Sequence, residues 1–435
     1  MAVPKHLPSL PEVYRTIAIP NGKGFWRKML AYAGPGYLVS VGYMDPGNWA
    51  TDIAGGSQFG YALLSVILLS NLMAILLQFL CVRLGVATGR DLAQVCREYF
   101  SPKVNFVLWV LCEIAIAACD LAELLGSAIA LQLLFGLPLA WGVCIMALDV
   151  IVLLLLQQKG FRYTEALVIT LVATIAGCFT AEILFSHPDV GEILLGLIPD
   201  HKIVRNREML YIAVGILGAT VMPHNLYLHS SIVQTRAWEK TSQKKWEAIK
   251  FGTIDSTVAL WLALFINSAI LIVAAATFHF SGNQHVADIQ DAYKLLSPLL
   301  GVGTASLIFA FALLASGQSS TLTATLAGQI VMEGFLQLRL PQWLRRLATR
   351  LIAIVPALMA IVFLGEQSAG ELLVLSQVIL SLQLPFAVIP LVIFTSDRRL
   401  MGEFVNPLWL KILAGAVTTI IVGLNVWLLS QTFLK

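Results

Sequence analysis

The sequence predicts an all-α integral membrane protein in which eleven helices cross the bilayer. Of its 435 residues, 58% are hydrophobic and only 12% are charged, about half the charged fraction of a soluble domain. The mean hydropathy is +0.82, and no polar half of the chain could form a water-soluble domain beside a membrane anchor. A net charge of +3 is too small and too scattered to indicate a nucleic-acid partner.

The eleven predicted helices are runs of about 20 mostly apolar residues, the length that crosses the hydrocarbon layer. Each run is bounded by charge, proline or glycine. Residues 83–103, between the second and the third of these runs, are expected to form a short interfacial helix. The predicted spans cover residues 30–56, 59–83, 104–131, 139–157, 163–186, 208–234, 253–279, 302–331, 347–365, 370–395 and 408–433.

Lysine and arginine residues concentrate on one side of these spans. The N-terminus and the loops after spans 2, 4, 6, 8 and 10 hold 23 of the 28, whereas the opposite side holds five. Because cytoplasmic loops carry the excess of positive charge, we expect a cytoplasmic N-terminus and an external C-terminus in a multi-pass cell-membrane protein. The sequence has no Asn-X-Ser/Thr sequon, which favours a prokaryotic inner membrane over a glycosylated eukaryotic one.

Two of the spans carry a helix breaker in the middle. Span 1 contains Pro46 within the sequence GYMDPGN, and span 6 contains Pro223 within the sequence ATVMPHN. Proline removes a backbone donor and clashes with the preceding turn, so both helices should leave helical geometry and free some carbonyl groups. Free carbonyls at mid-bilayer are tolerated only where they line a cavity or bind something.

The two breaks match each other. Setting one proline on the other also aligns Asn48 with Asn225 and Gly42 with Ala219. Five spans separate the breaks, so the second copy crosses the membrane in the opposite sense. Interrupted helices at matching places in two five-helix halves are typical of an inverted-repeat secondary transporter. The predicted organisation is a cytoplasmic N-terminus (1–29), a first repeat (30–186), an external loop (187–207), a second repeat (208–395), and a cytoplasmic loop with helix 11 (396–435).

Electron-pair donors gather around the breaks. Asp45 is ionisable and lies at mid-bilayer, where a charge costs at least ~2.5 kcal/mol to insert, so it marks a functional site. Asn48 offers an amide oxygen, Met222 a thioether sulfur, and Gly42 and Ala219 their backbone carbonyls. The oxygens alone would suit Na⁺, Mg²⁺ or Ca²⁺, whereas the sulfur shifts the preference to Mn²⁺, Fe²⁺ or Co²⁺.

Several segments resemble the Nramp family of proton-coupled divalent metal transporters: DPGN, TGRDLA, DLAE, MPHNLYLHS and SLQLPFAVIPLVIFTS, in chain order. The resemblance covers nearly the whole chain and implies a LeuT-like fold with helices 1 and 6 broken. It also implies import of Mn²⁺ and Fe²⁺, with Co²⁺, Cd²⁺ and Zn²⁺ as further cargoes, by alternating access. Gly42 stands where other members often have alanine. The metal ligands that the resemblance implies are Asp45, Asn48 and Met222, with the Ala219 and Gly42 carbonyls and Gln377 joining in particular states.

Span 3 carries two acids, Asp120 and Glu123, three residues apart on one helical face. Two acids on one intramembrane face repel each other unless a cation pairs with one of them. The candidate cations are His224 and Arg350. A relay from Asp45 through His224, Glu123 and Asp120 to Arg350 resembles the proton path proposed for the family. The alternative is a structural ion pair between the span 3 acids and Arg350.

Two other functions fit parts of the pattern. An intramembrane metalloenzyme could hold zinc with Asp45, His224 and His229, but zinc hydrolases need two histidines four residues apart beside a glutamate, and here the spacing is five. A Mg²⁺-selective relative of the same family would be expected to lack the sulfur of Met222. We therefore expect a transporter, not an enzyme, with no cofactor. Its expected partners are divalent metal ions, protons and the lipid bilayer, and it should work as a monomer.

Overall fold

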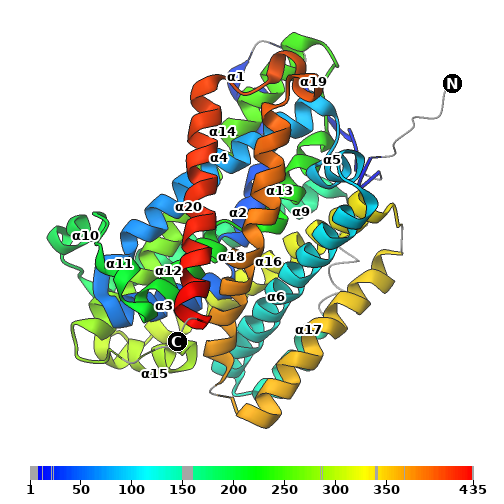
Figure 1. Cartoon of the computed structure of the whole chain (residues 1–435). Helices are drawn as coiled ribbons and strands as arrows, with labels where there is room; N and C mark the ends of the chain where they lie inside the picture. The colour runs from blue at the N-terminus through cyan, green and yellow to red at the C-terminus, as the bar shows by residue number, and fades with distance from the viewer. Residues whose placement is uncertain are drawn as a thin grey trace.

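The computed structural model describes residues 8–11, 13–20, 22, 24–148, 160–284, 286, 288–338, 341–366 and 368–433. Within these residues the chain forms a bundle of helices (Figure 1). The described part also holds a two-stranded parallel sheet, in which β1 (Ile17–Ala18) pairs with β2 (Arg236–Ala237). The expectation of an all-α chain therefore holds apart from this short sheet.

Eight helices among the described residues have at least 23 residues, enough to cross the roughly 30 Å of hydrocarbon in a bilayer. They are α4 (Leu64–Thr88), α6 (Pro102–Phe135), α9 (Phe161–Ser186), α14 (Ser242–Ala274), α16 (Ala305–Leu336), α17 (Gln342–Leu364), α18 (Ser368–Ser396) and α20 (Leu408–Phe433).

Shorter helices connect and complete the long ones. They are α1 (Phe25–Tyr32), α2 (Pro35–Gly42), α3 (Pro46–Phe59), η1 (Gly60–Leu63), α5 (Leu92–Tyr99), α7 (Leu139–Ala147), α10 (Val190–Gly196), α11 (Lys202–Arg205), α12 (Arg207–Thr220), α13 (Pro223–Ile232), η2 (Val233–Thr235), η3 (Ala275–His279), α15 (Ile289–Leu300), α19 (Arg398–Met401) and η4 (Gly402–Phe404).

Eight segments among the described residues are long and apolar enough to cross a membrane. They correspond to predicted spans 2, 3, 5, 6, 7, 8, 10 and 11, and the second half of span 1 is joined to span 2 in the segment Pro46–Thr88. Span 4 is described only as far as residue 148, and span 9 is α17, several of whose side chains lie outside the described residues. The total of eleven therefore stays a prediction.

Some predicted boundaries are wrong. Span 1 does not begin at residue 30, because α1 ends at Tyr32 and α2 starts at Pro35. Between them Gly34 has φ 135°, a backbone conformation that side chains rarely adopt and that interrupts the helix. Helix α14 starts at Ser242, well before the predicted residue 253. The prediction missed its first turns because they are polar and precede the apolar run. The predicted external loop 187–207 contains α10 and α11, and α15 lies between predicted spans 7 and 8. The interfacial helix expected within 83–103 is present as α5.

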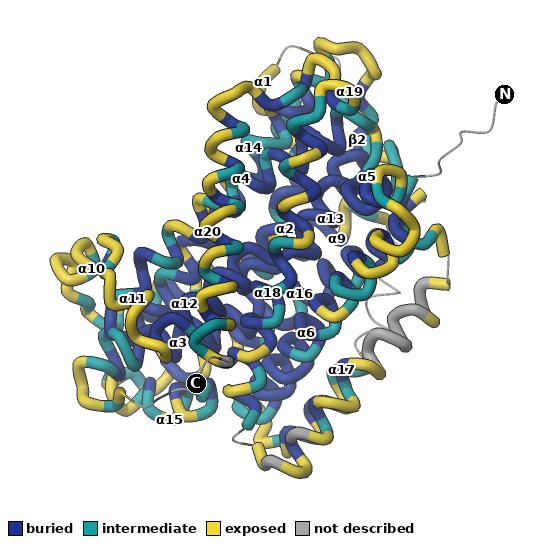
Figure 2. The backbone as a smooth tube through the Cα atoms, in the orientation of Figure 1, coloured by how far each residue is buried: buried dark blue, intermediate teal, exposed yellow. Residues whose placement is uncertain are grey.

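The interrupted helices lie in the centre of the bundle. In the most apolar part of Arg207–Thr235, 94% of the residues are buried, against 28% for α9 and for α20. Helix α3 packs on α12, α14 and α18, and α13 packs on α2, α4 and α16. Figure 2 shows this buried centre, with exposed residues on the outer helices. Both halves of each interrupted helix are therefore surrounded by protein.

Candidate metal site at the two helix breaks

The first break lies between α2 and α3. Helix α2 ends at Gly42, and α3 begins at Pro46, whose ring suits the first position of a helix. Asp45 is the N-cap of α3 and accepts a hydrogen bond from the Asn48 backbone N–H at 2.9 Å. The side chain of Asp45 is thus fixed at the head of α3, in the middle of span 1 as predicted.

Two carbonyls that this break frees are bound by side chains from other helices. Asn267 of α14 donates to the Tyr43 carbonyl at 2.8 Å. The Met44 carbonyl accepts hydrogen bonds from Trp49 at 3.3 Å and from the Ser316 hydroxyl of α16. The non-helical segment is therefore held open by its neighbours rather than left to refold into a continuous helix.

The second break lies between α12 and α13. Helix α12 ends at Thr220, Val221 leaves helical geometry with φ −109° and ψ 68°, and Met222 is the N-cap before Pro223. Among the described residues, the side chain of Met222 makes no capping hydrogen bond, so its sulfur is not used to close the helix end. It lies instead among buried apolar side chains of α6, α16 and α18.

The two prolines affect two particular carbonyls. Residue 46 lies four residues after Gly42, and residue 223 lies four residues after Ala219. An α-helical carbonyl normally accepts from the N–H four residues later, and proline has no N–H. The carbonyls of Gly42 and Ala219 therefore lose their ordinary donors, which leaves both oxygens available to a ligand.

Three of the side chains predicted as ligands have oxygens without a hydrogen-bond partner among the described residues. They are Asp45 through Oδ2, Asn48 through Oδ1 and Gln377 through Oε1, and each residue is at most 1% exposed. Buried polar atoms are nearly always paired in native proteins, so three orphaned acceptors near one another need an explanation. A cation that binds between them would supply the missing partner.

Close contacts place Met222 and Gln377 against the two ends of the first break. A Cβ built on Gly47 would overlap the Gln377 amide of α18, and a Cβ on Gly42 would lie 3.2 Å from the Met222 sulfur. The sulfur of Met222 therefore adjoins the first break, and Gln377 packs against the turn after Asp45. All six predicted ligand residues lie at the two breaks or directly against them.

Helix α6 runs beside both breaks. Gly126 packs directly against the Pro46 ring, and Cys119 shares a buried cluster with Met222. Glu123 lies between these positions on the same helical face, and its Oε1 accepts from the Cys119 thiol at 3.6 Å. The predicted acid Glu123 therefore faces the site, and Asp120, one turn away, is also buried.

The remaining members of the predicted proton relay are placed only in part. His224 follows Pro223 directly, is buried, and has no partner for Nδ1 among the described residues. Helix α17 packs against α6, but the side chain of Arg350 lies outside the described residues. His229 lies 2.9 Å from Gln78, which in turn donates to the Tyr43 hydroxyl.

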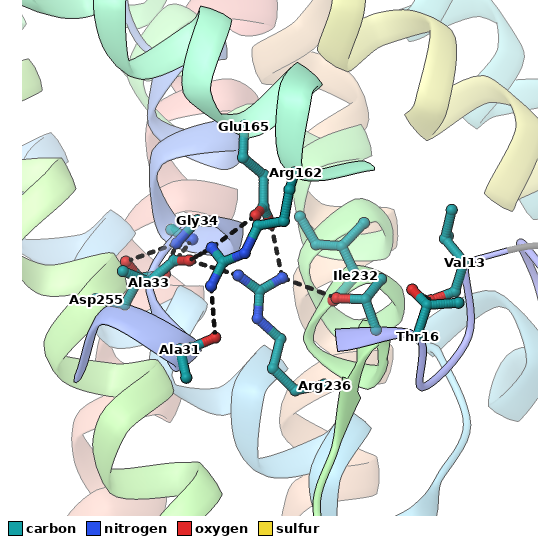
Figure 3. A network of polar contacts seen from close by, with 12 residues as sticks. Val13, Thr16, Ala31, Ala33, Gly34, Arg162, Glu165, Ile232, Arg236 and Asp255 are labelled. Carbon is teal, nitrogen blue, oxygen red and sulfur yellow. Dashed lines mark hydrogen bonds and ion pairs between the residues drawn. The ribbon is translucent and has the colours of Figure 1, made fainter. Parts of the chain in front are cut away.

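A buried charge network lies at the other end of α2, and sequence reasoning missed it (Figure 3). The Arg236 guanidinium lies 2.6 Å from the Glu165 carboxylate and donates to the Ala33 carbonyl. Asp255 accepts from the backbone N–H groups of Gly34 at 3.1 Å and of Gly36 at 2.6 Å. The start of α2 is thus fastened to α9, α14 and the segment after α13.

Sequence reasoning also left Asn225 out of the site. Its alignment with Asn48 was the available signal, and the structure places its amide directly against Gly42. The buried network above gave a weaker signal, because charged residues near the ends of spans usually read as solvent-facing anchors.

Comparison with known proteins identifies the family of this chain. The family model described as natural resistance-associated macrophage protein-like matches residues 36–431. The divalent metal cation transporter MntH of Nostoc sp. is 80% identical over 432 residues, which cover 99% of this chain and 98% of that protein.

Solved structures give the same result. The manganese transporter of Eremococcus coleocola has 42% sequence identity and a TM-score of 0.89, and the match covers 96% of this chain and 90% of that one. The nucleobase-cation-symport-1 family transporter Mhp1, with 14% identity and a TM-score of 0.62, shares the fold over 99% of this chain and 96% of its own. The fold is the LeuT-like one that was expected, and the metalloenzyme alternative is wrong. The chain belongs to the Nramp family and is a divalent metal cation transporter, not an enzyme.

Proposed function

We propose that this chain imports Mn²⁺ and Fe²⁺ across the membrane together with protons, by alternating access. The observation that carries the proposal is the convergence of orphaned acceptor oxygens, proline-freed carbonyls and one thioether sulfur at the two breaks. The printed description of the Eremococcus coleocola relative as a manganese transporter supports Mn²⁺ as a cargo.

The proposed ligands explain a preference for transition metals. Asp45 supplies the negative charge, Asn48 and Gln377 supply amide oxygens, and the carbonyls of Gly42 and Ala219 complete a set of hard donors. The thioether of Met222 adds a soft donor, which favours Mn²⁺, Fe²⁺, Co²⁺, Cd²⁺ and Zn²⁺ over Ca²⁺ and Mg²⁺. Because Met222 is buried against the first break, a Mg²⁺-selective role is the weaker candidate.

The proposed proton route leaves the metal site along α6. A proton from Asp45 would pass to His224, then to Glu123 and Asp120, and finally toward Arg350 on α17. The contact of Gly126 with Pro46 supports the place of Glu123 in this route, because it sets the face of α6 that bears Glu123 against the break. The last step rests on the sequence alone, since the Arg350 side chain lies outside the described residues.

The proposal also includes the arrangement in the membrane. Residues 30–186 and 208–395 would be inverted repeats that rock against each other around the breaks. The charge distribution supports a cytoplasmic N-terminus and an external C-terminus in a bacterial cell membrane. A single chain carries both breaks, so we propose that the monomer is the working unit.

Uptake by proteoliposomes tests the function directly. We expect Mn²⁺ uptake to saturate, to exceed Ca²⁺ and Mg²⁺ uptake, and to acidify the vesicle interior. The measurement compares Mn²⁺ uptake at two external pH values, with a pH-sensitive dye inside the vesicles. Equal transport of Mn²⁺ and Mg²⁺, or metal entry without acidification, would contradict the corresponding part of the proposal.

A further inference from the structure

Asn225 occupies the head of α13, one turn after the second break. Its backbone N–H donates to the Met222 carbonyl at 3.2 Å, which fixes the start of the helix. Its side chain is fully buried and lies against Gly42, where a Cβ would overlap the Asn225 Nδ2 atom. The amide of Asn225 thus adjoins the same glycine as the Met222 sulfur.

The hydrogen bonds of this amide are incomplete. Nδ2 donates to the Val39 carbonyl at 3.5 Å, the limit of a hydrogen bond, and Oδ1 has no partner among the described residues. Asn225 shares this orphaned amide oxygen with Asn48, and with Asn105, Asn267 and Asn406, which lie away from both prolines in the sequence. Asn48 and Asn225 each follow their proline by two residues, and both have an orphaned oxygen.

Gly42 is what permits this approach. A side chain at residue 42 would occupy the space of the Asn225 amide and press on the Met222 sulfur. The glycine therefore lets the Asn225 amide, with Nδ2 as its nearest atom, lie beside residue 42, whose carbonyl has lost its ordinary donor. An alanine at this position would move the amide away from the break.

From this arrangement we propose that Asn225 is a further ligand of the transported divalent ion, through its Oδ1 atom. The inference rests on the proposed metal site and adds a ligand from the second repeat, equivalent to Asn48 in the first. When the amide turns so that Oδ1 instead of Nδ2 faces Gly42, beside the Met222 sulfur, Oδ1 replaces one water of the hydrated ion.

Titration calorimetry of the purified full chain with Mn²⁺ tests the proposal. We expect Asn225→Leu, which removes the amide at similar volume, to weaken Mn²⁺ binding about tenfold. Asn225→Asp keeps an oxygen and should bind Mn²⁺ at least as tightly as the wild type. The matched control is Asn105→Ala, another buried asparagine on α6 that bonds the Phe335 carbonyl away from the breaks, and its affinity should not change.

A spectroscopic readout separates a ligand from a merely structural residue. With Co²⁺ as the probe, Asn225→Leu should shift the visible absorption bands of the bound ion, because one oxygen donor is lost. Gly42→Ala should produce a similar shift, and the two changes together should have no additional effect on affinity. Wild-type affinity with an unchanged Co²⁺ spectrum in Asn225→Leu would overturn the proposal.

Two further variants keep the outcome decisive. If Asn225→Leu does not fold, the Co²⁺ spectrum of Gly42→Ala decides the question in its place, and a wild-type spectrum there overturns the proposal. Asp45→Ala identifies which proposal has failed. Normal binding in Asp45→Ala would reject the metal site as a whole, whereas loss of binding there with wild-type behaviour in Asn225→Leu would reject only the additional ligand.

Discussion

Gly126 of α6 lies directly against the Pro46 ring, so closely that a Cβ at residue 126 would overlap two of its carbon atoms. The relationship joins the helix that bears the two intramembrane acids to the turn that begins with Asp45. Because Gly126 has no side chain, α6 can approach Pro46 closely, and this approach sets the distance between the proposed proton route and the proposed metal site.

The first prediction is that Gly126→Ala lowers both thermal stability and Mn²⁺ uptake. An additional methyl group in a close-packed interface typically costs ~1–3 kcal/mol, because neighbouring groups must shift. Here the shift would separate α6 from α3. Thermal unfolding in detergent and uptake by proteoliposomes would measure the two effects.

The control for this substitution is Gly177→Ala on α9, where a Cβ would meet nothing within 4 Å. Alanine favours a helix over glycine by up to ~1 kcal/mol, so this variant should be as stable as the wild type or more stable. If Gly126→Ala and Gly177→Ala behave alike, the contact with Pro46 does not limit the approach of α6.

A second prediction concerns Asp45, which brings the only full negative charge among the proposed ligands. Asp45→Ala should abolish Mn²⁺ uptake while the protein still inserts and folds, because neutral donors alone replace too little of the hydration of a divalent ion. Asp291→Ala, at an exposed acid paired with Lys294, is the control and should transport normally. Wild-type uptake by Asp45→Ala would reject the assignment.

The third prediction is that Met222 sets selectivity. Met222→Ala should retain part of the Mn²⁺ uptake, but Ca²⁺ or Mg²⁺ should now compete for the site, because thioether sulfur contributes almost nothing to binding those ions. Competition assays in proteoliposomes would measure this change. Met209→Ala removes another buried methionine, on α12, and controls for the cavity alone. Unchanged Ca²⁺ competition in Met222→Ala would show that the sulfur is not the filter.

The fourth prediction concerns the buried pair of Arg236 and Glu165, whose side chains are each 1% exposed. Glu165→Gln would remove the negative charge that faces a buried guanidinium, and breaking a buried ion pair in this way typically costs ~3–5 kcal/mol. The melting temperature should fall by several degrees. Asp291→Asn breaks an exposed pair with Lys294 and should change stability by less than ~1 kcal/mol. Equal melting temperatures would show that the network adds no stability.

The sequence predicts local features of this molecule better than distant pairings. Pro46 and Pro223 mark the breaks because proline acts on its own turn. The place of Asp45 at a break could be predicted as well, because it directly precedes Pro46. The start of α14 at Ser242 is missed, since a polar helical extension looks like a loop when spans are found by hydropathy alone.

The network at the start of α2 could not be predicted for a different reason. Arg236 and Glu165 are 71 residues apart, and no periodicity relates them. Each lies near the end of a predicted span, where charged residues usually face water. Only the packing of α9 beside the segment after α13 brings them together. Asn225 lies between these cases, because its alignment with Asn48 was visible but its contact with Gly42 was not.

The last prediction concerns coupling. Glu123 and Asp120 lie on α6 beside the breaks, and neither is among the proposed metal ligands. Glu123→Gln or Asp120→Asn should therefore leave Mn²⁺ affinity almost unchanged. The same variants should reduce metal-driven acidification inside proteoliposomes and flatten the pH profile of Mn²⁺ uptake, because an amide cannot accept and release the transported proton.

The control is Glu113→Gln. Glu113 lies on the same helix, closer to its N-terminus than Asp120, and accepts a hydrogen bond from Trp109. The control variant should keep the wild-type pH profile, so any change in the other two variants belongs to their position beside the breaks. Loss of metal binding with normal proton flux would show that the metal and proton routes are assigned the wrong way round. A lower melting temperature with both transport properties unchanged would instead favour a structural ion pair with Arg350.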